Sequence, residues 1–296
     1  MRLTAEDLTY LSQCAVAAAK EAGALIASYA NKSVAVQRKE GGNSVASQVV
    51  TEVDLLSEKI IINVLQPTCE QYDLALLTEE SIDDRARLEK DYFWCVDPMD
   101  GTLAFTESRP GYSVSIALVS RSAEAVIGVV YDPVTHRLYQ ATKGQGVLRN
   151  GEPWGLPAVS IEDKSLTLVC DRGFIVKPYY AELCNALQTI AKEHGYCGLQ
   201  TLERNGAVLN ACFILENPPA VYFKCPKPQQ GGGSLWDFAA TAALFHELGF
   251  VATDFHGKPL DLNRADSTFM NHRGVLFAMD KTLAADIHGL LALCSK

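Results

Sequence analysis

The sequence of 296 residues predicts an α+β fold in which helices cover layers of sheet. Apolar residues recur at helical spacing near the N-terminus, and strand-like segments separated by short turns follow, which is typical of a largely antiparallel sheet. In the second half, helical and strand-like segments alternate, which favours a smaller α/β part. A chain of this length buries roughly 75% of its unfolded surface, so a sizeable core is available.

The first half is expected to begin with paired helices. Thr4 and Asp7 resemble an N-cap, and leucines and alanines then recur at helical spacing, which predicts a helix over residues 5–30. A Gly- and Ser-rich loop, KEGGNSVASQ (39–48), precedes a second helical segment at 51–65. The expected strands lie at 73–78, 92–96, 112–120, 125–132 and 137–142, and the short turns between the last three suit antiparallel pairing.

A stretch rich in Gly and Pro, GQGVLRNGEPWGLPAVS (144–160), predicts a boundary between an N-terminal part, 1–155, and a C-terminal part, 156–296. The second part is expected to run strand (LTLVC), helix (178–194), helix (GAVLNACFILE), strand (AVYFK), helix (LWDFAATAALFHELG), strand (VLFAM) and a final helix. A cleft between two such parts is a common place for a site.

Composition excludes several classes of protein. The formal net charge of -9 argues against a nucleic acid polymer as partner, because a phosphate backbone needs clustered Lys and Arg. No apolar run approaches the ~18 residues of a membrane span, and the N-terminus lacks the layout of a signal peptide, so we expect a cytoplasmic protein with no membrane partner.

The nine cysteines are odd in number and show no C-x-x-C spacing, which predicts reduced, buried thiols rather than disulfides.

The phrase VDPMDGT (96–102) places two acids at the end of an apolar strand. Pro98 keeps Asp97 extended, and Gly101 allows a tight turn after Asp100, before Thr102 opens a short helix. Both carboxylates can then point into one small volume, where they repel unless they share a proton or a cation. The N–H groups of Gly101 and Thr102 add a corner for an anion. The phrase therefore indicates a metal beside a phosphate, although a polar turn explains it equally well in isolation.

Other acids stand in similar contexts. Glu79 and Glu80 end an apolar strand in LLTEES, Asp237 lies in the first turn of the apolar helix LWDFAATAALF, and Asp54 lies in VVTEVDLLSE. Each alone is explained by solvated charge or by an acid at a helix start. Their occurrence together and in this order gives them more weight than any one has alone.

The phrases VTEVD, LTEES, WCVDPMDGTLAF, SVSIALV, GVVYDPVTHRLYQATKGQGVLRNG and WDFAATAALFHELG resemble the inositol monophosphatase family, within the superfamily of magnesium-dependent, lithium-sensitive phosphomonoesterases. They run from about residue 49 to residue 250 and so cover most of the chain. The set of D-P-x-D-G-T with an upstream E-E and a downstream W-D is specific. The resemblance implies a layered αβαβα sandwich of the inositol monophosphatase/fructose bisphosphatase type and a homodimer.

The resemblance also implies the metal ligands. Glu79, Asp97 and the carbonyl of Met99 would hold one Mg²⁺, and Asp97 would bridge to a second ion completed by Asp100 and Asp237. A third, weaker ion beside Glu79 is compatible with the family. All of these ligands are oxygen, which favours magnesium over zinc or copper.

The implied catalytic residues are Thr102, Asp54 and Glu79. Thr102, oriented by Asp54, would hydrogen-bond the attacking water, and Glu79 lies within reach of that water. The implied substrate contacts are Gly101, Thr102, Gly206, Ala207 and Asp237. No residue would become covalently phosphorylated.

The expected reaction is Mg²⁺-dependent hydrolysis of a small polyol or sugar phosphate, most of all inositol monophosphate. The chain departs from inositol-specific members in PKPQQGGGSLWD, which has no acid between Lys227 and Trp236. Two alternatives therefore stay open: an adenosine 3',5'-bisphosphate phosphatase, and a non-catalytic regulator that binds a sugar phosphate.

Other motif matches are weak. The two acids of DPMDGT stand three residues apart, whereas the aspartyl-phosphate phosphatases separate theirs by two. GYSVS (111–115) lacks the second glycine of a serine nucleophile elbow, and the glycine-rich stretches lack a dinucleotide fingerprint. No two of the histidines stand four residues apart, so none is expected to hold a metal.

Overall fold

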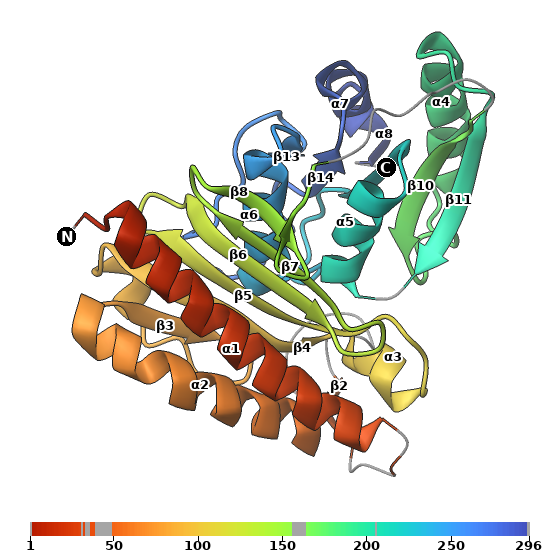
Figure 1. The fold of residues 1–296 in the computed structure, drawn as a ribbon. Helices are drawn as coiled ribbons and strands as arrows, with labels where there is room; N and C mark the ends of the chain where they lie inside the picture. The colour runs from red at the N-terminus through yellow and green to blue at the C-terminus, as the bar shows by residue number, and fades with distance from the viewer. Residues whose placement is uncertain are drawn as a thin grey trace.

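A computed structural model describes residues 2–30, 32, 36–38, 49–155, 164–204 and 206–294. Two sheets alternate with three layers of helices, so the predicted αβαβα sandwich is confirmed (Figure 1). None of the described helices is long and apolar enough to cross a membrane. The predicted loop 39–48 lies outside the described residues. Residues 156–163 do as well, and the predicted division after residue 155 stays a prediction.

The first helical layer consists of α1 (Ala5–Tyr29) and α2 (Glu52–Tyr72), which lie side by side on one face of the larger sheet (Figure 1). Both begin with a capping box, Thr4 with Asp7 and Thr51 with Asp54, in which each side chain satisfies a backbone N–H of the other. The second helix is longer than predicted, because it continues through Pro67 to Tyr72.

The larger sheet follows chain order from β3 to β9, and only β3 and β4 pair in parallel. This confirms the predicted run of hairpins. Its strands are β3 (Ala75–Thr78), β4 (Tyr92–Asp100), β5 (Ser113–Ser120), β6 (Ala125–Asp132), β7 (Arg137–Thr142), β8 (Gly146–Arg149) and β9 (Glu152–Pro153). A short β1 (Val36–Arg38) pairs separately with β2 (Val49–Thr51), and a 3-10 turn, η2 (Ala86–Leu88), follows β3.

The smaller sheet has the order β11, β10, β12, β14, β13. Its strands are β10 (Leu166–Asp171), β11 (Leu199–Arg204), β12 (Ala220–Lys224), β13 (Val251–Thr253) and β14 (Val275–Ala278). Its outer face packs against α4 (Tyr180–Glu193), α7 (Lys281–His288) and α8 (Leu291–Cys294). The single final helix that we predicted is therefore wrong, since two short helices stand in its place.

Two helices, α5 (Ala207–Glu216) and α6 (Leu235–Glu247), lie between the sheets (Figure 1). The contact of α6 with β6 is very close. A Cβ atom on Gly128 would lie 2.2 Å from the carbonyl oxygen of Ala240, so only glycine permits this approach. Because Asp237 stands in the first turn of α6, the same contact helps to fix that acid against the larger sheet.

A disulfide joins Cys225, just after β12, to Cys294 in α8, with 5.4 Å between the Cα atoms. The expectation of reduced thiols throughout is therefore wrong for this pair, while the other seven cysteines are free. The two residues are 69 positions apart and belong to no motif, so only the packing of α8 against the smaller sheet brings them together.

Reduction of the disulfide is expected to lower the free energy of unfolding by about 2–4 kcal/mol, because the bond restricts the unfolded chain. Denaturant unfolding with and without a thiol reductant measures the difference. The double variant Cys225→Ser/Cys294→Ser should match the reduced protein and no longer respond to reductant. As a control, Cys197→Ser removes an exposed free thiol and should leave the difference in place. Equal stability of the oxidised and reduced protein would contradict the prediction.

Candidate active site

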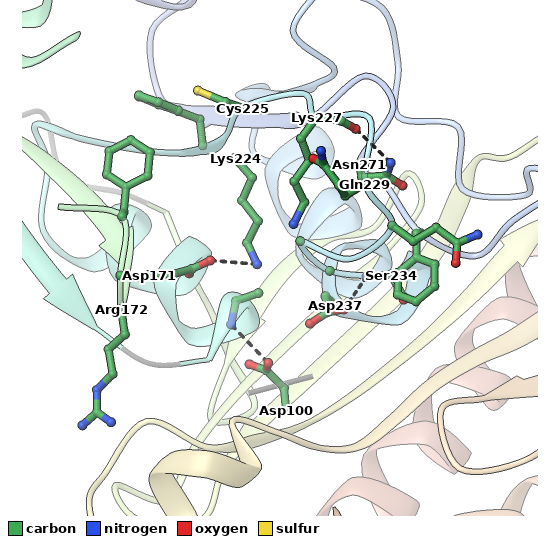
Figure 2. A pocket seen from close by; sticks show the side chains of 18 of the residues that line it. Asp100, Asp171, Arg172, Lys224, Cys225, Lys227, Gln229, Ser234, Asp237 and Asn271 are labelled. Atoms are coloured by element: carbon green, nitrogen blue, oxygen red, sulfur yellow. Dashed lines mark hydrogen bonds and ion pairs between the residues drawn. The ribbon is translucent and has the colours of Figure 1, made fainter. Parts of the chain in front are cut away.

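A pocket of about 1570 Å³ opens between the two sheets (Figure 2). Nine of the predicted site residues line it: Glu79, Asp97, Met99, Asp100, Gly101, Thr102, Gly206, Ala207 and Asp237. They come from β4, from the ends of β3 and β4, and from the starts of α3 (Thr102–Thr106), α5 and α6. Asp54 does not line the pocket and lies behind Thr102 instead.

A β-bulge in β4 shapes the acidic end of this pocket. Asp97 pairs with Ser115 and Asp100 with Ser113, so β4 carries one more residue than β5 between these pairs. The strand therefore continues to Asp100, and its predicted end at residue 96 is wrong. A bulge bends a strand and changes the direction of its side chains. Here the bulge lies between Asp97 and Asp100, and both of these acids are buried. Within the bulge, the backbone N–H of Met99 donates to Asp97 Oδ1 at 3.0 Å.

Three carboxylates meet at the bulge. Asp97, Asp100 and Asp237 each offer one oxygen atom, and these atoms lie within 4.8 Å of one another. Burial raises the pKa of Asp100 well above its usual range, and the charge of Asp237 raises it further. Burial likewise raises the pKa of Asp237 to about 6. A divalent cation would remove this repulsion, and the all-oxygen set suits a hard ion such as Mg²⁺.

The GGGS stretch positions Asp237. The backbone N–H of Ser234 donates to Asp237 Oδ2 at 2.6 Å, which closes a capping box at the start of α6. The three preceding residues, Gly231, Gly232 and Gly233, have φ values of 112°, 81° and 100°, which side chains other than glycine rarely adopt. The chain therefore needs glycine at these three positions to enter α6 in this conformation.

Backbone donors at the start of α5 hold Asp100. Its Oδ1 accepts from the N–H of Ala207 at 3.1 Å, and its Oδ2 accepts from the N–H of Val208 at 2.9 Å. Figure 2 shows Asp100 pointing toward this helix from the larger sheet. Ala207, itself a predicted substrate contact like Gly206, thus uses its N–H to position a carboxylate, which the sequence did not indicate.

Asp54 holds the hydroxyl group of Thr102. Thr102 Oγ1 lies 2.9 Å from Asp54 Oδ1 and 3.1 Å from the carbonyl oxygen of Met99, so it can donate to either. The other oxygen of Asp54 accepts from the N–H of Thr51 at 2.7 Å and from its hydroxyl at 2.6 Å. Burial raises the pKa of Asp54, against the effect of these hydrogen bonds. With its proton directed at one of these oxygens, the Thr102 hydroxyl can accept a hydrogen bond from a water molecule in the pocket.

Glu79 stands apart from the three clustered acids. Its backbone N–H donates to the carbonyl oxygen of Val96 at 3.1 Å, which fixes the end of β3 beside β4. Its carboxylate lines the pocket but is not among the groups that meet within 4.8 Å. Its charge nevertheless raises the pKa of Asp54 and of Asp237, so it contributes to the negative potential of the site.

Sequence reasoning missed a partly buried cation, Lys224. Its Nζ lies 2.8 Å from Asp171 Oδ2 (Figure 2). Asp171 Oδ1 accepts from the side chains of Asn210 and Tyr222. Burial opposes the charge of Lys224, but Asp171, Asp237 and other acids outweigh it and raise the pKa of Lys224. The alternation of side chains along β12 could have indicated this position. It puts Lys224 on the same face of the strand as Tyr222, toward the core between the sheets.

A model described as the inositol monophosphatase family matches residues 7–291. The chain belongs to the inositol monophosphatase family. Among its relatives, Nus factor SuhB of Escherichia coli (strain K12) is 31% identical over 245 residues, which cover 82% of this chain and 84% of that protein. Inositol-1-monophosphatase of Synechocystis sp. is 29% identical over 262 residues, which cover 87% of this chain and 83% of that protein.

Solved structures of inositol monophosphatases share the fold. The structure of inositol monophosphatase from Anabaena (Nostoc) sp. PCC 7120 superposes with a TM-score of 0.69 at 24% identity, and covers 97% of each chain. This family member therefore has the layered architecture of that enzyme, with the acidic pocket between its two sheets.

Proposed function

We propose that the protein is a Mg²⁺-dependent phosphomonoesterase that hydrolyses a small polyol or sugar phosphate, most of all inositol monophosphate. The observation that carries the proposal is the meeting of Asp97, Asp100 and Asp237 in one pocket with the Thr102–Asp54 pair. Membership of the inositol monophosphatase family supports a phosphatase. The lithium sensitivity and the homodimer that the resemblance implies stay predictions, as does the cytoplasmic location expected from the sequence.

The residues present fit a magnesium site. Asp97, Asp100 and Asp237 offer hard oxygen atoms at close range, and Glu79 and the carbonyl of Met99 line the same pocket. In this proposal they would hold two Mg²⁺ ions, and the family is compatible with a third, weaker ion beside Glu79. When bound, Mg²⁺ supplies a water of lowered pKa and neutralises charge on the phosphate.

The chain's own groups orient the reactants. The hydroxyl of Thr102, fixed by Asp54, accepts a hydrogen bond from the attacking water. The N–H groups of Gly101 and Thr102 face the phosphate. The nucleophile is water, and no side chain has to form a covalent bond with phosphorus.

Replacement of Thr102 by alanine is expected to lower kcat about tenfold to a hundredfold, because one hydrogen bond to the water is lost. Metal affinity should change little. Thr102→Ser, which keeps the hydroxyl, is the matched control and should retain most activity. Steady-state kinetics and titration with Mg²⁺ measure both properties. A large loss of metal binding in Thr102→Ala would mean that the hydroxyl serves the metal rather than the water.

Phosphate release from inositol 1-phosphate tests the function directly. We expect activity that depends on Mg²⁺, disappears in excess chelator and returns when Mg²⁺ is added. Full activity in chelator would refute the metal-dependent mechanism. A parallel assay on adenosine 3',5'-bisphosphate decides between substrates: if catalytic efficiency favours the nucleotide by more than about a hundredfold, the bisphosphate phosphatase becomes the better assignment.

A second candidate is a non-catalytic role. Relatives at 31% identity carry the name Nus factor SuhB, which states no phosphatase activity, and this favours the second candidate. The two candidates differ in one measurement, since a regulator without catalysis would release no phosphate from any ester in the panel.

A further inference from the structure

The pocket is larger than one small phosphate ester requires. Its volume of about 1570 Å³ exceeds the roughly 300–1,000 Å³ of ordinary small-molecule sites. The three clustered acids and the Thr102 hydroxyl occupy the end next to the larger sheet. The remaining wall belongs to the smaller sheet and its connections, and that wall carries basic side chains.

Three lysines line this wall from separate segments. Lys177 precedes α4, Lys224 ends β12, and Lys227 follows β12. Figure 2 shows the side chains of Lys224 and Lys227 extending into the pocket toward the side on which Asp237 lies. Lys224 forms an ion pair with Asp171 at 2.8 Å, so it is held in place.

The backbone of Lys227 is fixed by Asn271. The N–H of Lys227 donates to the Asn271 carbonyl oxygen at 2.8 Å, and the Asn271 side chain donates to the Lys227 carbonyl oxygen at 2.9 Å. The lysine side chain then passes over Gly232, where a Cβ atom would lie 3.2 Å from Lys227 Cε and 3.6 Å from Nζ. The glycine at this position thus leaves room for the ammonium group beside the start of α6.

The lysines repel one another. Burial lowers the pKa of Lys227, and the charges of Lys177 and Lys224 lower it further. A negative group of a ligand placed beside Lys227 would act against these contributions and favour the charged form of the lysine. The wall is therefore suited to a negative group on the ligand.

We infer that Lys227, with Lys177 at the rim and Lys224 behind it, forms a subsite for a second anionic group of the substrate. This inference rests on the proposed phosphomonoesterase function and adds to its substrate class. Besides inositol monophosphate, the pocket accepts esters with two anionic groups: a phosphate that is cleaved at the acidic end, and a second phosphate or carboxylate that binds the lysines. The absence of an acid between Lys227 and Trp236 agrees with this, because an acid there would repel such a group.

Matched substrate pairs test the subsite. Fructose 1,6-bisphosphate and fructose 1-phosphate differ only in a second phosphate, as do adenosine 3',5'-bisphosphate and adenosine 3'-phosphate. 2-Phosphoglycerate and glycerol 2-phosphate differ in a carboxylate. In at least one pair, we expect the member with two anionic groups to have a kcat/KM at least about tenfold higher than its singly phosphorylated partner. The gain should come through a lower KM, because a charge-assisted contact is added. The pair that responds identifies the second group as phosphate or carboxylate.

The variant Lys227→Gln should reduce that ratio to near one, because the loss in kcat/KM on the member with two anionic groups is at least about tenfold larger than any loss on the singly phosphorylated partner. Lys192→Gln, an exposed lysine of α4 outside the pocket, removes the same charge and should preserve the ratio. Two results would overturn the subsite while the phosphatase assignment stands. One is a kcat/KM ratio near one for every substrate pair in the wild type, and the other is an equal loss of kcat/KM on both members of each pair in Lys227→Gln. Absence of hydrolysis of every ester would instead overturn the proposed function.

Discussion

The variant Asp237→Asn is expected to lose at least about a hundredfold in kcat while it keeps its fold. Its carboxylate is one of the three that meet at the β4 bulge, and a metal contributes several kcal/mol to a transition state of phosphate hydrolysis. The amide oxygen of asparagine can still accept the N–H of Ser234, so the capping box loses little. The missing charge at the start of α6 costs only about 0.3–1 kcal/mol. Steady-state kinetics and thermal unfolding separate the two effects.

Glu247 provides the matched control at the other end of α6. Its carboxylate also accepts backbone N–H groups, from Gly144 at 2.9 Å and Gly146 at 3.0 Å, but it lies outside the pocket. Glu247→Gln should therefore keep full turnover. Turnover like that of the wild type in Asp237→Asn would remove this acid from the catalytic site.

Local patterns explain why much of the fold was predictable. Strands at 125–132, 137–142 and 220–224 have the expected bounds, because apolar and β-branched runs between turn residues define them within a few positions. The edge strand β11 was missed, because Leu199–Arg204 is polar and largely exposed on both faces and has no apolar period. Its pairing with β10 comes from the tertiary fold rather than from its own sequence.

Part of the candidate site was likewise predictable from the sequence and part was not. The acids were found because they stand in short phrases whose order along the chain is itself a signal. The groups that position them were not, since each contact joins distant segments. Asp100 meets the N–H of Ala207 across 107 positions, and Lys224 meets Asp171 only because β10 and β12 are neighbours. No spacing rule encodes such pairs.

Gly206 offers a test of the Asp100 contact, and Gly206→Ala is expected to lower kcat by about a hundredfold. A Cβ atom there would lie 2.5 Å from the Gly111 carbonyl oxygen and 2.8 Å from Asp100 Oδ2, so the carboxylate or the start of α5 has to move. A displacement of about 1 Å in a site that depends on geometry can cost this much. Kinetics with inositol 1-phosphate and a Mg²⁺ titration would show the loss.

A positive φ alone does not account for the expected loss of turnover, because Gly144→Ala places a side chain at a similar φ elsewhere. Gly144 has a φ of 73°, against 75° for Gly206, and no atom lies within 4 Å of the added Cβ position. Both variants should lose about 1–3 kcal/mol of stability from the positive φ. Only Gly206→Ala should also lose turnover. If the two variants keep equal activity, the N–H groups of α5 do not set the position of Asp100 for catalysis.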